Sequence, residues 1–385
     1  MKKTAACLWV LFLALPVFGQ GNNTGNGGPD GDYRSLSQRI LNLEKKNDQF
    51  NLFLNFAAGY QLENLGEAWE SAFRARHLRV EMKGQFGEHL SYRIRHHLNS
   101  SQQRSTFEQF SRATDVMMVG WKFNERFTLY GGKLCQYLGG IEYDINPMFI
   151  YQYSETISNI DCFQAGVALS FTPWRGQEFV FNITNAYTDR FAEVYPLGVL
   201  EDGTPIEAAH HPLSYIFNWN GTLFNGRVET RWSLSTIQQA KGFRDNQAFL
   251  GTKLKLSRLQ VFFDWMGSRE GLDRLQIASR ELGRTGYLTQ VHYDSFLLNA
   301  RWRFAPGWEL YGQGMYETAA VPGLGRYRTA TGYIGSLEYY PVKDQDLRVC
   351  LAYVGRNYRY SAESALAGRQ THRIEIGLMY RIKAY

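Results

Sequence analysis

The sequence predicts an all-β fold, a 16-stranded antiparallel transmembrane β-barrel preceded by a short N-terminal periplasmic helix. Two observations support this prediction. Apolar and polar residues alternate along many segments of the chain, and the connections between these segments are alternately short and long. The composition agrees, because 15% of the 385 residues are aromatic and the 37 Gly far outnumber the 10 Pro. Such a mixture favours strands joined by turns.

The segment "THRIEIGLMYRIKAY", residues 371–385, shows the alternation clearly. Apolar side chains occupy every second position from Ile374 to Ile382, and Arg373, Glu375 and Arg381 lie between them. Successive side chains of a strand point to opposite faces. This strand therefore has one apolar face and one charged face.

The first fifty residues are expected to lie outside the barrel. Residues 1–19 read as a signal peptide, with Lys2 and Lys3, an apolar stretch too short for a membrane helix, and a small-residue cleavage site. Residues 20–32 form a Gly/Asn-rich linker. Residues 33–50 form a short heptad helix with its seam at Leu36, Ile40, Leu43, Asn47 and Phe50. This helix packs either on the barrel or on copies of itself.

Charge and cysteines exclude several classes of protein. Loss of Lys2 and Lys3 with the signal lowers the formal net charge from +6 to about +4, a mild excess that does not predict nucleic-acid binding. The mature chain keeps Cys135, Cys162 and Cys350. An odd number without close spacing argues against a disulfide framework or a zinc site and favours structural cysteines.

The barrel is expected to occupy residues 51–385. Sixteen strands are predicted, at 51–63, 73–86, 90–99, 113–123, 127–137, 162–172, 178–187, 213–223, 228–237, 247–256, 259–267, 288–304, 308–318, 331–342, 347–358 and 371–383. Seven short turns alternate with eight longer segments, which places both ends of the barrel at the same rim.

This regular asymmetry separates an outer-membrane barrel from a soluble sandwich. Sandwich strands are about five or six residues long and show no short end and long end. Outer-membrane barrels have tilted strands of about ten residues, short periplasmic turns and long outer loops. Aromatic residues such as Phe86, Phe127, Trp174 and Trp308 also gather near the short turns, as expected of an interfacial girdle. The apolar faces therefore meet lipid.

The charged faces must then point inward. A Lys or Arg facing lipid costs roughly 2–4 kcal/mol at the membrane midplane, and a dozen would exceed the roughly 5–15 kcal/mol that stabilises an ordinary fold. The basic residues assigned to the inner wall are Arg79, Lys83, Arg93, Arg95, Lys122, Arg231, Lys253, Lys255, Arg301, Arg303, Arg348, Arg356, Arg373 and Arg381. The acids assigned with them are Glu81, Glu178, Glu229, Asp264, Glu309, Glu338 and Glu375.

Such an interior is polar and net positive, so it is expected to be an aqueous channel rather than a dry core. About half of these charges are expected to form ion pairs, and the surplus favours anions over cations. The alternative to a pore is a closed barrel that acts as an adhesin or scaffold.

The third long loop, residues 138–159, differs from the others. It contains Glu142, Asp144 and Glu155 and has no Lys or Arg. Its acids either lie in solvent at the surface, or the loop folds inward and sets them against the basic wall across a constriction.

Other chemistry has weak support in the sequence. His96-His97 point to opposite faces of a strand, and His210-His211 lie in an acidic loop that is more simply an exposed polar segment, so no metal site is predicted. A hydrolase in the barrel wall would use His372, for which no convincing partner is present. No cofactor and no enzymatic activity are expected.

Taken together, residues 51–385 resemble the outer-membrane porins of Gram-negative bacteria, and in particular the phosphate-selective porin O and P family. The resemblance rests on the sixteen strands, the long third loop and the basic pairs. The final strand resembles the signal read by the barrel-assembly machinery, at Glu375, Gly377, Tyr380, Ile382 and Tyr385, although Lys383 and Ala384 precede the final aromatic residue.

The resemblance implies a homotrimer in outer-membrane lipid that takes up small anionic or neutral solutes passively. Phosphate-selective members use basic residues on the inward loop, and residues 138–159 supply none. A general pore with a weak anion preference is therefore expected.

Overall fold

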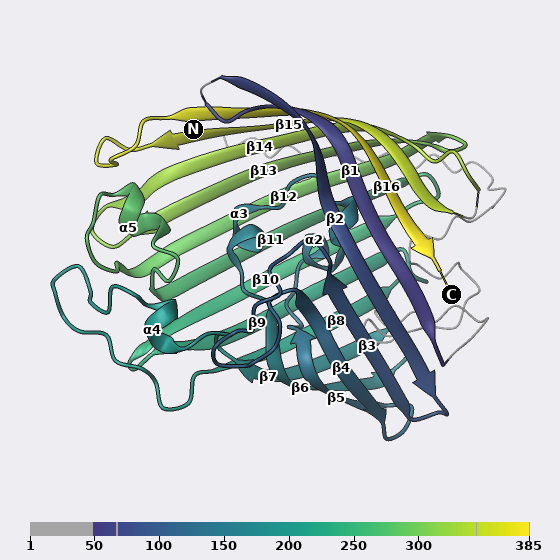
Figure 1. The fold of residues 1–385 in the computed structure, drawn as a ribbon, viewed down its shortest axis with the longest axis horizontal. Helices are drawn as coiled ribbons and strands as arrows, with labels where there is room; N and C mark the ends of the chain where they lie inside the picture. The colour runs from purple at the N-terminus through teal and green to yellow at the C-terminus, as the bar shows by residue number, and fades with distance from the viewer. Residues whose placement is uncertain (1–48, 67, 344, 385) are drawn as a thin grey trace, which may run out of the picture.

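The protein is a closed barrel of sixteen antiparallel strands, as predicted (Figure 1). The computed structural model describes residues 49–66, 68–343 and 345–384. Each strand pairs with its neighbour in sequence, and β1 (Asn51–Asn64) pairs with β16 (Arg369–Lys383) to close the ring. Closure leaves no open sheet edge, which the bilayer core demands.

The other strands follow the predicted order with small changes at their ends. They are β2 (Trp69–Phe86), β3 (Leu90–His97), β4 (Thr114–Lys122), β5 (Phe127–Cys135), β6 (Phe163–Trp174), β7 (Gln177–Asn185), β8 (Leu213–Leu223), β9 (Val228–Ala240), β10 (Phe243–Lys255), β11 (Leu259–Leu272), β12 (Thr289–Ala305), β13 (Trp308–Val321), β14 (Gly325–Tyr339) and β15 (Asp346–Tyr360).

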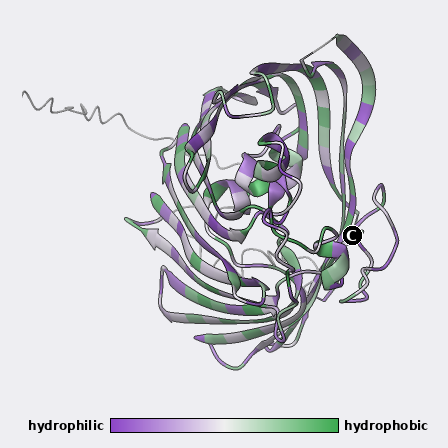
Figure 2. Cartoon of the chain, turned by 90° about the vertical axis from the view of Figure 1, so that its left-hand side faces the viewer, coloured by the Kyte–Doolittle hydropathy of each residue, from purple (hydrophilic) through white to green (hydrophobic). Residues whose placement is uncertain are grey.

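The outer face of the barrel is apolar. Exposed hydrophobic side chains alternate with buried ones along the strands, as at Leu298, which is 57% exposed, and Leu297, which is 1% exposed. Figure 2 shows the resulting bands of hydrophilic and hydrophobic residues along the strands. Apolar side chains exposed on this scale indicate contact with lipid.

The two rims of the barrel differ. At one rim the strands are joined by the seven short turns. Aromatic pairs such as Phe127–Phe171 (ring centroids 4.7 Å apart) and Trp308–Tyr339 (4.5 Å) lie beside these turns. This arrangement fits an interfacial aromatic girdle.

At the opposite rim, three connections are shorter than expected. The β9–β10 connection is only Lys241-Gly242, the β13–β14 connection is residues 322–324, and β2 already begins at Trp69 after β1 ends at Asn64. The strands there continue beyond the apolar band as hairpins, which sequence periodicity had placed in loops. The longer loops include α4 (Phe191–Val194) and α5 (Ile277–Glu281).

The predicted signal peptide, the linker and the heptad helix up to residue 48 lie outside the described residues, as does Tyr385. Across the part of the chain that is described, no helix is both long and apolar enough to cross a membrane.

Candidate functional site

The loop between β5 and β6, residues 136–162 and here called L3, folds into the barrel. It contains α2 (Ile141–Asp144), the 3-10 turn η1 (Pro147–Phe149) and α3 (Glu155–Asn159). α2 contacts β10 and β11, α3 contacts β11 and β12, and η1 contacts β1. Figure 2 shows these short helices enclosed by the ring of strands. Of the two positions expected for this loop, the structure shows the inward one.

L3 begins with a close approach of backbone to the wall. The Gly139 N–H donates to Ser233 Oγ (2.8 Å), and the Gly140 N–H donates to the Arg231 carbonyl (2.9 Å). A Cβ added to Gly139 would lie 2.5 Å from the Phe249 carbonyl oxygen. Gly140 has φ of 92°, a conformation that favours glycine. The Gly-Gly pair is thus needed to seat the loop.

The next two amides of L3 bind an acid of the wall. The Ile141 and Glu142 N–H groups donate to the two Asp264 carboxylate oxygens, at 2.8 and 2.7 Å. Asp264, which was predicted only as a lumen acid, therefore fixes the start of α2. A carboxylate suits this role because it accepts at both oxygens.

Arginines from the opposite wall hold the middle of L3 through backbone carbonyls. Arg76 donates to Ile150 O (3.3 Å), Arg356 to Tyr153 O (3.0 Å), Arg348 to Met148 O (3.5 Å) and Arg373 to Tyr151 O. Because a guanidinium has five N–H donors, each arginine can bind a carbonyl and a carboxylate together. Three predicted wall cations, Arg348, Arg356 and Arg373, are thus engaged in holding L3.

Part of the interior is apolar, which corrects the expectation of a wholly polar lumen. Leu138, Met148 and Tyr151 of L3 belong to one buried cluster with wall residues such as Phe249 and Met266. The sequence counted charges on the inner face, but apolar residues share that face at intervals. They form a local core wherever L3 covers them.

The three L3 acids have different surroundings. Asp144 pairs with Arg231 (2.5 Å), and Glu155 pairs with Arg328 (2.6 Å). Glu142 is fully buried and accepts hydrogen bonds from Ser154 Oγ (2.6 Å) and Gln313 Nε2 (3.1 Å). Burial raises the pKa of the Glu142 carboxyl to about 8. Two of the three acids therefore face wall cations, and Glu142 faces polar uncharged groups together with Asp264.

One group of wall cations lies on β2, β3 and β4. Arg79 Nε, Arg95 Nε and His97 Nε2 all approach Asp115 Oδ2, at 3.9, 3.1 and 2.8 Å. Arg93 pairs with Glu81 (2.8 Å). These side chains are largely buried but keep some access to the lumen, at 11–15% exposure for Arg79, Arg93, Arg95 and His97. Basic groups outnumber carboxylates in this group.

A second group lies on β9, β10 and β12 nearer the short turns. Lys255 pairs with Glu229 (2.7 Å), and Arg301 pairs with Glu309 (2.8 Å). Within the described part of the chain, neither Lys253 nor Arg303 forms an ion pair with a carboxylate. Lys253 lies within electrostatic range of Glu229 and of the cations Lys255, Arg301 and Arg231.

The remaining predicted cations lie close to the same rim. Lys83 and Arg381 both lie over the Phe53 ring, at 5.0 and 3.9 Å from its centroid. Arg381 also pairs with Asp346 (3.6 Å). Lys122 pairs with Glu125 (2.6 Å). Other predicted acids are buried with partners: Ser170 Oγ donates to Glu178 (2.6 Å), Arg348 pairs with Glu338 (2.6 Å), and Arg76 pairs with Glu375 (3.1 Å).

Sequence reasoning missed several inward charges. They are Arg76, Asp115, Lys133, Asp245, Glu317 and Arg328. Irregular pairing interrupts the alternation near the first three, at Ala57/Ala58, at Arg95/His96 and at Gly132, whose φ is 121°. Asp245 and Arg328 lie at the starts of β10 and β14, before the predicted starts of these strands at residues 247 and 331. Only Glu317 could have been predicted from the sequence. It lies an even number of positions from Glu309 on β13, so the two side chains point to the same face.

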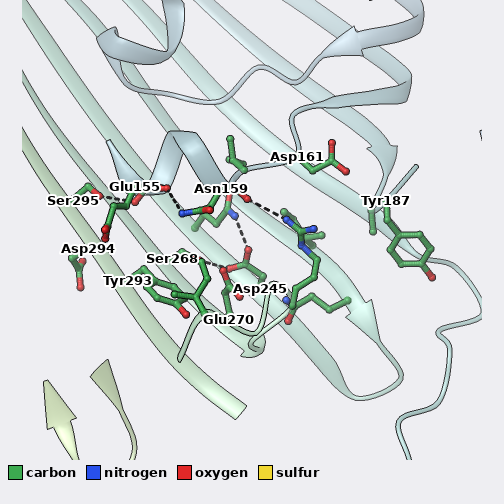
Figure 3. A pocket seen from close by; sticks show the side chains of 18 of the residues that line it. Glu155, Asn159, Asp161, Tyr187, Asp245, Ser268, Glu270, Tyr293, Asp294 and Ser295 are labelled. Atoms are coloured by element: carbon green, nitrogen blue, oxygen red, sulfur yellow. Dashed lines mark hydrogen bonds between the residues drawn. The ribbon is translucent and has the colours of Figure 1, made fainter. Parts of the chain in front are cut away.

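A pocket lies on the long-loop side of L3, between α3 and strands β9 to β14 (Figure 3). Its lining includes Glu155, Asp161, Asp245, Glu270 and Arg274. The Ser268 hydroxyl donates to Asp245 (2.8 Å), and Arg274 donates to the Asn159 carbonyl (3.2 Å). Solutes that approach L3 from this side therefore meet a surface richer in acids than the opposite half of the wall.

The predicted assembly signal lies on β16. Glu375 and Gly377 face inward and are buried, whereas Tyr380 and Ile382 lie on the alternate positions. Among the described residues, no three His, Cys, Asp or Glu side chains form a group that fits a metal ion.

A closed sixteen-stranded barrel with an apolar outer face, a charged inner wall and an inward third loop defines an outer-membrane porin. The family model of the phosphate-selective porin O and P matches residues 50–382, and the chain belongs to that family. It is a passive diffusion channel of the Gram-negative outer membrane and not an enzyme.

Solved structures of similar fold are also porins and outer-membrane channels. The channel DcaP of Acinetobacter baumannii has a TM-score of 0.60 at 10% identity, covering 88% of this chain and 99% of its own. OmpT of Vibrio cholerae in its trimer form has a TM-score of 0.56 at 8% identity, covering 87% and 99%. Salmonella typhi OmpF in complex with daunomycin has a TM-score of 0.55 at 10% identity, covering 88% and 99%. No curated protein matches the sequence significantly.

Proposed function

We propose that this porin passes small hydrophilic solutes with a weak preference for anions, and that the basic group on β2 to β4 produces much of this preference. The observation that carries the proposal is the sharing of one carboxylate oxygen of Asp115 by Arg79, Arg95 and His97. A single carboxylate cannot neutralise two arginines, so positive potential remains beside L3. In a water-filled channel a surplus of this sign attracts anions.

Lys253 and Arg303 support the same sign of selectivity on the other side of the barrel. Their neighbours Lys255, Arg231 and Arg301 form ion pairs with carboxylates, whereas these two form no direct ion pair among the described residues, and Glu229 acts on Lys253 only from a longer range. They are the second proposed anion contact.

Reversal potentials across planar bilayers in a KCl gradient test the proposal. The wild-type channel is expected to favour chloride, and Arg79→Gln/Arg95→Gln is expected to lower the chloride-to-potassium permeability ratio. Arg112→Gln is the matched control, because Arg112 pairs with Asp189 in the loops and its side chain is 43% exposed. A wild-type channel that prefers potassium would contradict the proposal.

The solutes are proposed to be anions in general rather than phosphate alone. The supporting observation is that the described L3 residues 138–159 include no Lys or Arg. Current block by phosphate, sulfate and dicarboxylates at matched charge distinguishes the cases. Comparable block by all three is expected, and block by phosphate alone would show a dedicated phosphate site.

The assembly is proposed to be a homotrimer inserted by the barrel-assembly machinery through the β16 signal. Support comes from the trimer form in which OmpT of Vibrio cholerae was solved. Native mass spectrometry of the detergent-solubilised protein is expected to give three copies per particle. A single copy per particle would exclude the trimer.

A further inference from the structure

Two cysteines lie together at the two ends of L3. Cys135 is the last residue of β5, and Cys162 directly precedes β6. The strands pair in register at Cys135 and Phe163, and the Gln136 N–H donates to the Cys162 carbonyl (2.8 Å). This neighbourhood could not be predicted from the sequence, because 26 residues separate the two cysteines.

The two thiols lie near each other. Cys135 and Cys162 are within electrostatic range of one another and of Tyr143, whose hydroxyl lies 3.1 Å from Cys135 Sγ. The Tyr143 hydroxyl also donates to the Gln136 carbonyl (2.8 Å). Tyr143 therefore keeps a hydrogen bond whether or not the thiols remain free.

This arrangement fits the geometry of a disulfide. A disulfide requires Cα atoms within about 7 Å, with side chains that can meet. Directly opposed residues of antiparallel strands have Cα atoms about 4.5–5.5 Å apart, and these cysteines are displaced by a single residue from such a pair. Because Cys162 precedes β6, its side chain is not held to the alternation of the strand and can turn toward the Cys135 thiol.

The location of the protein favours oxidation. An outer-membrane protein passes through the bacterial periplasm, where disulfides form and persist. The third cysteine of the barrel, Cys350, is 2% exposed on β15, and its thiol faces the Gly377 carbonyl at 3.6 Å. It therefore provides an internal control.

We propose that Cys135 and Cys162 form a disulfide that fastens the two ends of L3 together in the mature protein. Each thiol loses its proton, and the sulfur–sulfur bond forms as two electrons pass to a disulfide-bearing oxidant of the periplasm. That oxidant is released as a dithiol. The cross-link closes a loop that spans the lumen, so L3 stays seated even when an individual ion pair opens. The proposal is independent of which solutes the channel passes.

Peptide mapping of the protein from freshly isolated outer membranes tests the proposal. Free thiols are first blocked with N-ethylmaleimide without reductant. The expected result is a cross-linked peptide containing Cys135 and Cys162, lighter by two hydrogen atoms than the two thiol peptides, with Cys350 in a separate peptide. Detection of Cys135 and Cys162 both alkylated before reduction would overturn the proposal, and this wild-type measurement does not depend on the folding of any variant.

Reduction should then loosen L3. Cleavage of residues 136–162 by added protease is expected to be about tenfold faster after treatment with dithiothreitol, a factor well within the stabilisation attributed to disulfides closing loops of this length. Cys135→Ser/Cys162→Ser should be cleaved at the fast rate with or without reductant, whereas Cys350→Ser should behave like the wild type. An equal effect of reductant on the double variant would show that the disulfide is not the cause.

Discussion

At the scale of single residues, the arginines of this barrel have two different tasks that the sequence does not separate. Arg348 and Arg356 hold L3 and pair with buried acids, whereas Arg79 and Arg95, each with 11% of its side chain exposed, share Asp115. A strand pattern tells which face an arginine occupies, but its partner depends on residues that are distant in the sequence. The charge available to a solute is therefore decided by pairing.

The ion pair between Asp144 and Arg231 gives a direct test. Asp144→Asn removes the partner of Arg231, which lies 2.5 Å away, and adds one unit of uncompensated positive charge at L3. A unit charge at about 4 Å through water is worth about 1 kcal/mol. The chloride-to-potassium permeability ratio is expected to rise up to about fivefold.

Reversal potentials in a KCl gradient measure this change. Asp189→Asn is the matched control, since Asp189 pairs with Arg112 in the outer loops (2.7 Å). An unchanged ratio in Asp144→Asn would mean that Arg231 does not contribute to selectivity.

Glu142 should make the seating of L3 depend on pH. The groups that surround it are Ser154 and Tyr153 of L3, Asp264 of β11, and Tyr311 and Gln313 of β13. Burial raises the pKa of the Glu142 carboxyl from 4.5 to about 8. At pH values between these two, Glu142 is therefore protonated in the folded state and deprotonated in the unfolded chain. The stabilising contribution is complete below pH 4.5 and is lost as pH rises through about 8.

Hydrogen exchange of L3 amides measures this dependence. Protection of residues 141–155 is expected to fall between the two pKa values, 4.5 and about 8 (roughly, by up to tenfold per pH unit), in the wild type and to stay nearly constant in Glu142→Gln. Equal pH dependence in both proteins would assign the effect to another group.

For many charged residues, the face of the strand that they occupy could be predicted from the alternation of side chains alone. The prediction failed at identifiable positions. The alternation placed Arg93, Lys255 and Arg301 on the inner face because a lipid-facing charge is too costly. It failed at Asp115 and Lys133, because pairing irregularities at Arg95/His96 and Gly132 shift the alternation. A bulge of this kind has no reliable mark in one sequence.

At the scale of the element, L3 is where sequence and structure differ most. Its inward fold depends on wall groups such as Asp264, Ser233 and Arg356, which lie about 90 to 200 residues away along the chain. Neither its acids nor its aromatic residues could reveal these partners. The Gly139-Gly140 pair at the start of L3 is visible in the sequence. Its role is not, because it depends on the close approach of Gly139 to the backbone of β9 and β10.

Gly139→Ala tests the close approach. The added Cβ would meet the backbone of three wall residues at 2.5–2.9 Å, namely the Phe249 and Arg231 carbonyl oxygens and the Ser233 nitrogen. These atoms cannot rotate away, so the start of L3 must move, at a cost of roughly 1–3 kcal/mol. Faster proteolysis of L3 and altered single-channel conductance are expected.

Gly131→Ala is the matched control for this prediction, because the nearest atom to its added Cβ is 4.0 Å away. It should leave proteolysis and conductance unchanged. Similar behaviour of the two variants would mean that the wall tolerates a side chain at Gly139.

At the scale of the whole molecule, the barrel could be predicted because its constraints are global. Sixteen strands, one closure between β1 and β16 and an apolar outer face all follow from satisfying backbone hydrogen bonds in lipid. Strand ends at the long-loop rim were predicted poorly, since the β9–β10 hairpin at Lys241-Gly242 continues above the membrane, where the apolar alternation no longer marks a strand.

A charged side chain placed on the lipid-facing surface should destabilise the barrel more strongly the closer it lies to the middle of the bilayer. Leu298→Arg places a charge near the middle of β12, where Leu298 is 57% exposed and lies beside exposed Phe263. It is expected to lower the free energy of unfolding by roughly 2–4 kcal/mol in lipid vesicles. Phe304→Arg lies one residue before the end of the same strand, so it should cost about 0–1 kcal/mol. Denaturant titrations of both variants in vesicles measure the difference. Since both sites are on one strand and one face, equal costs would mean that the exposed band of this barrel does not cross a bilayer core.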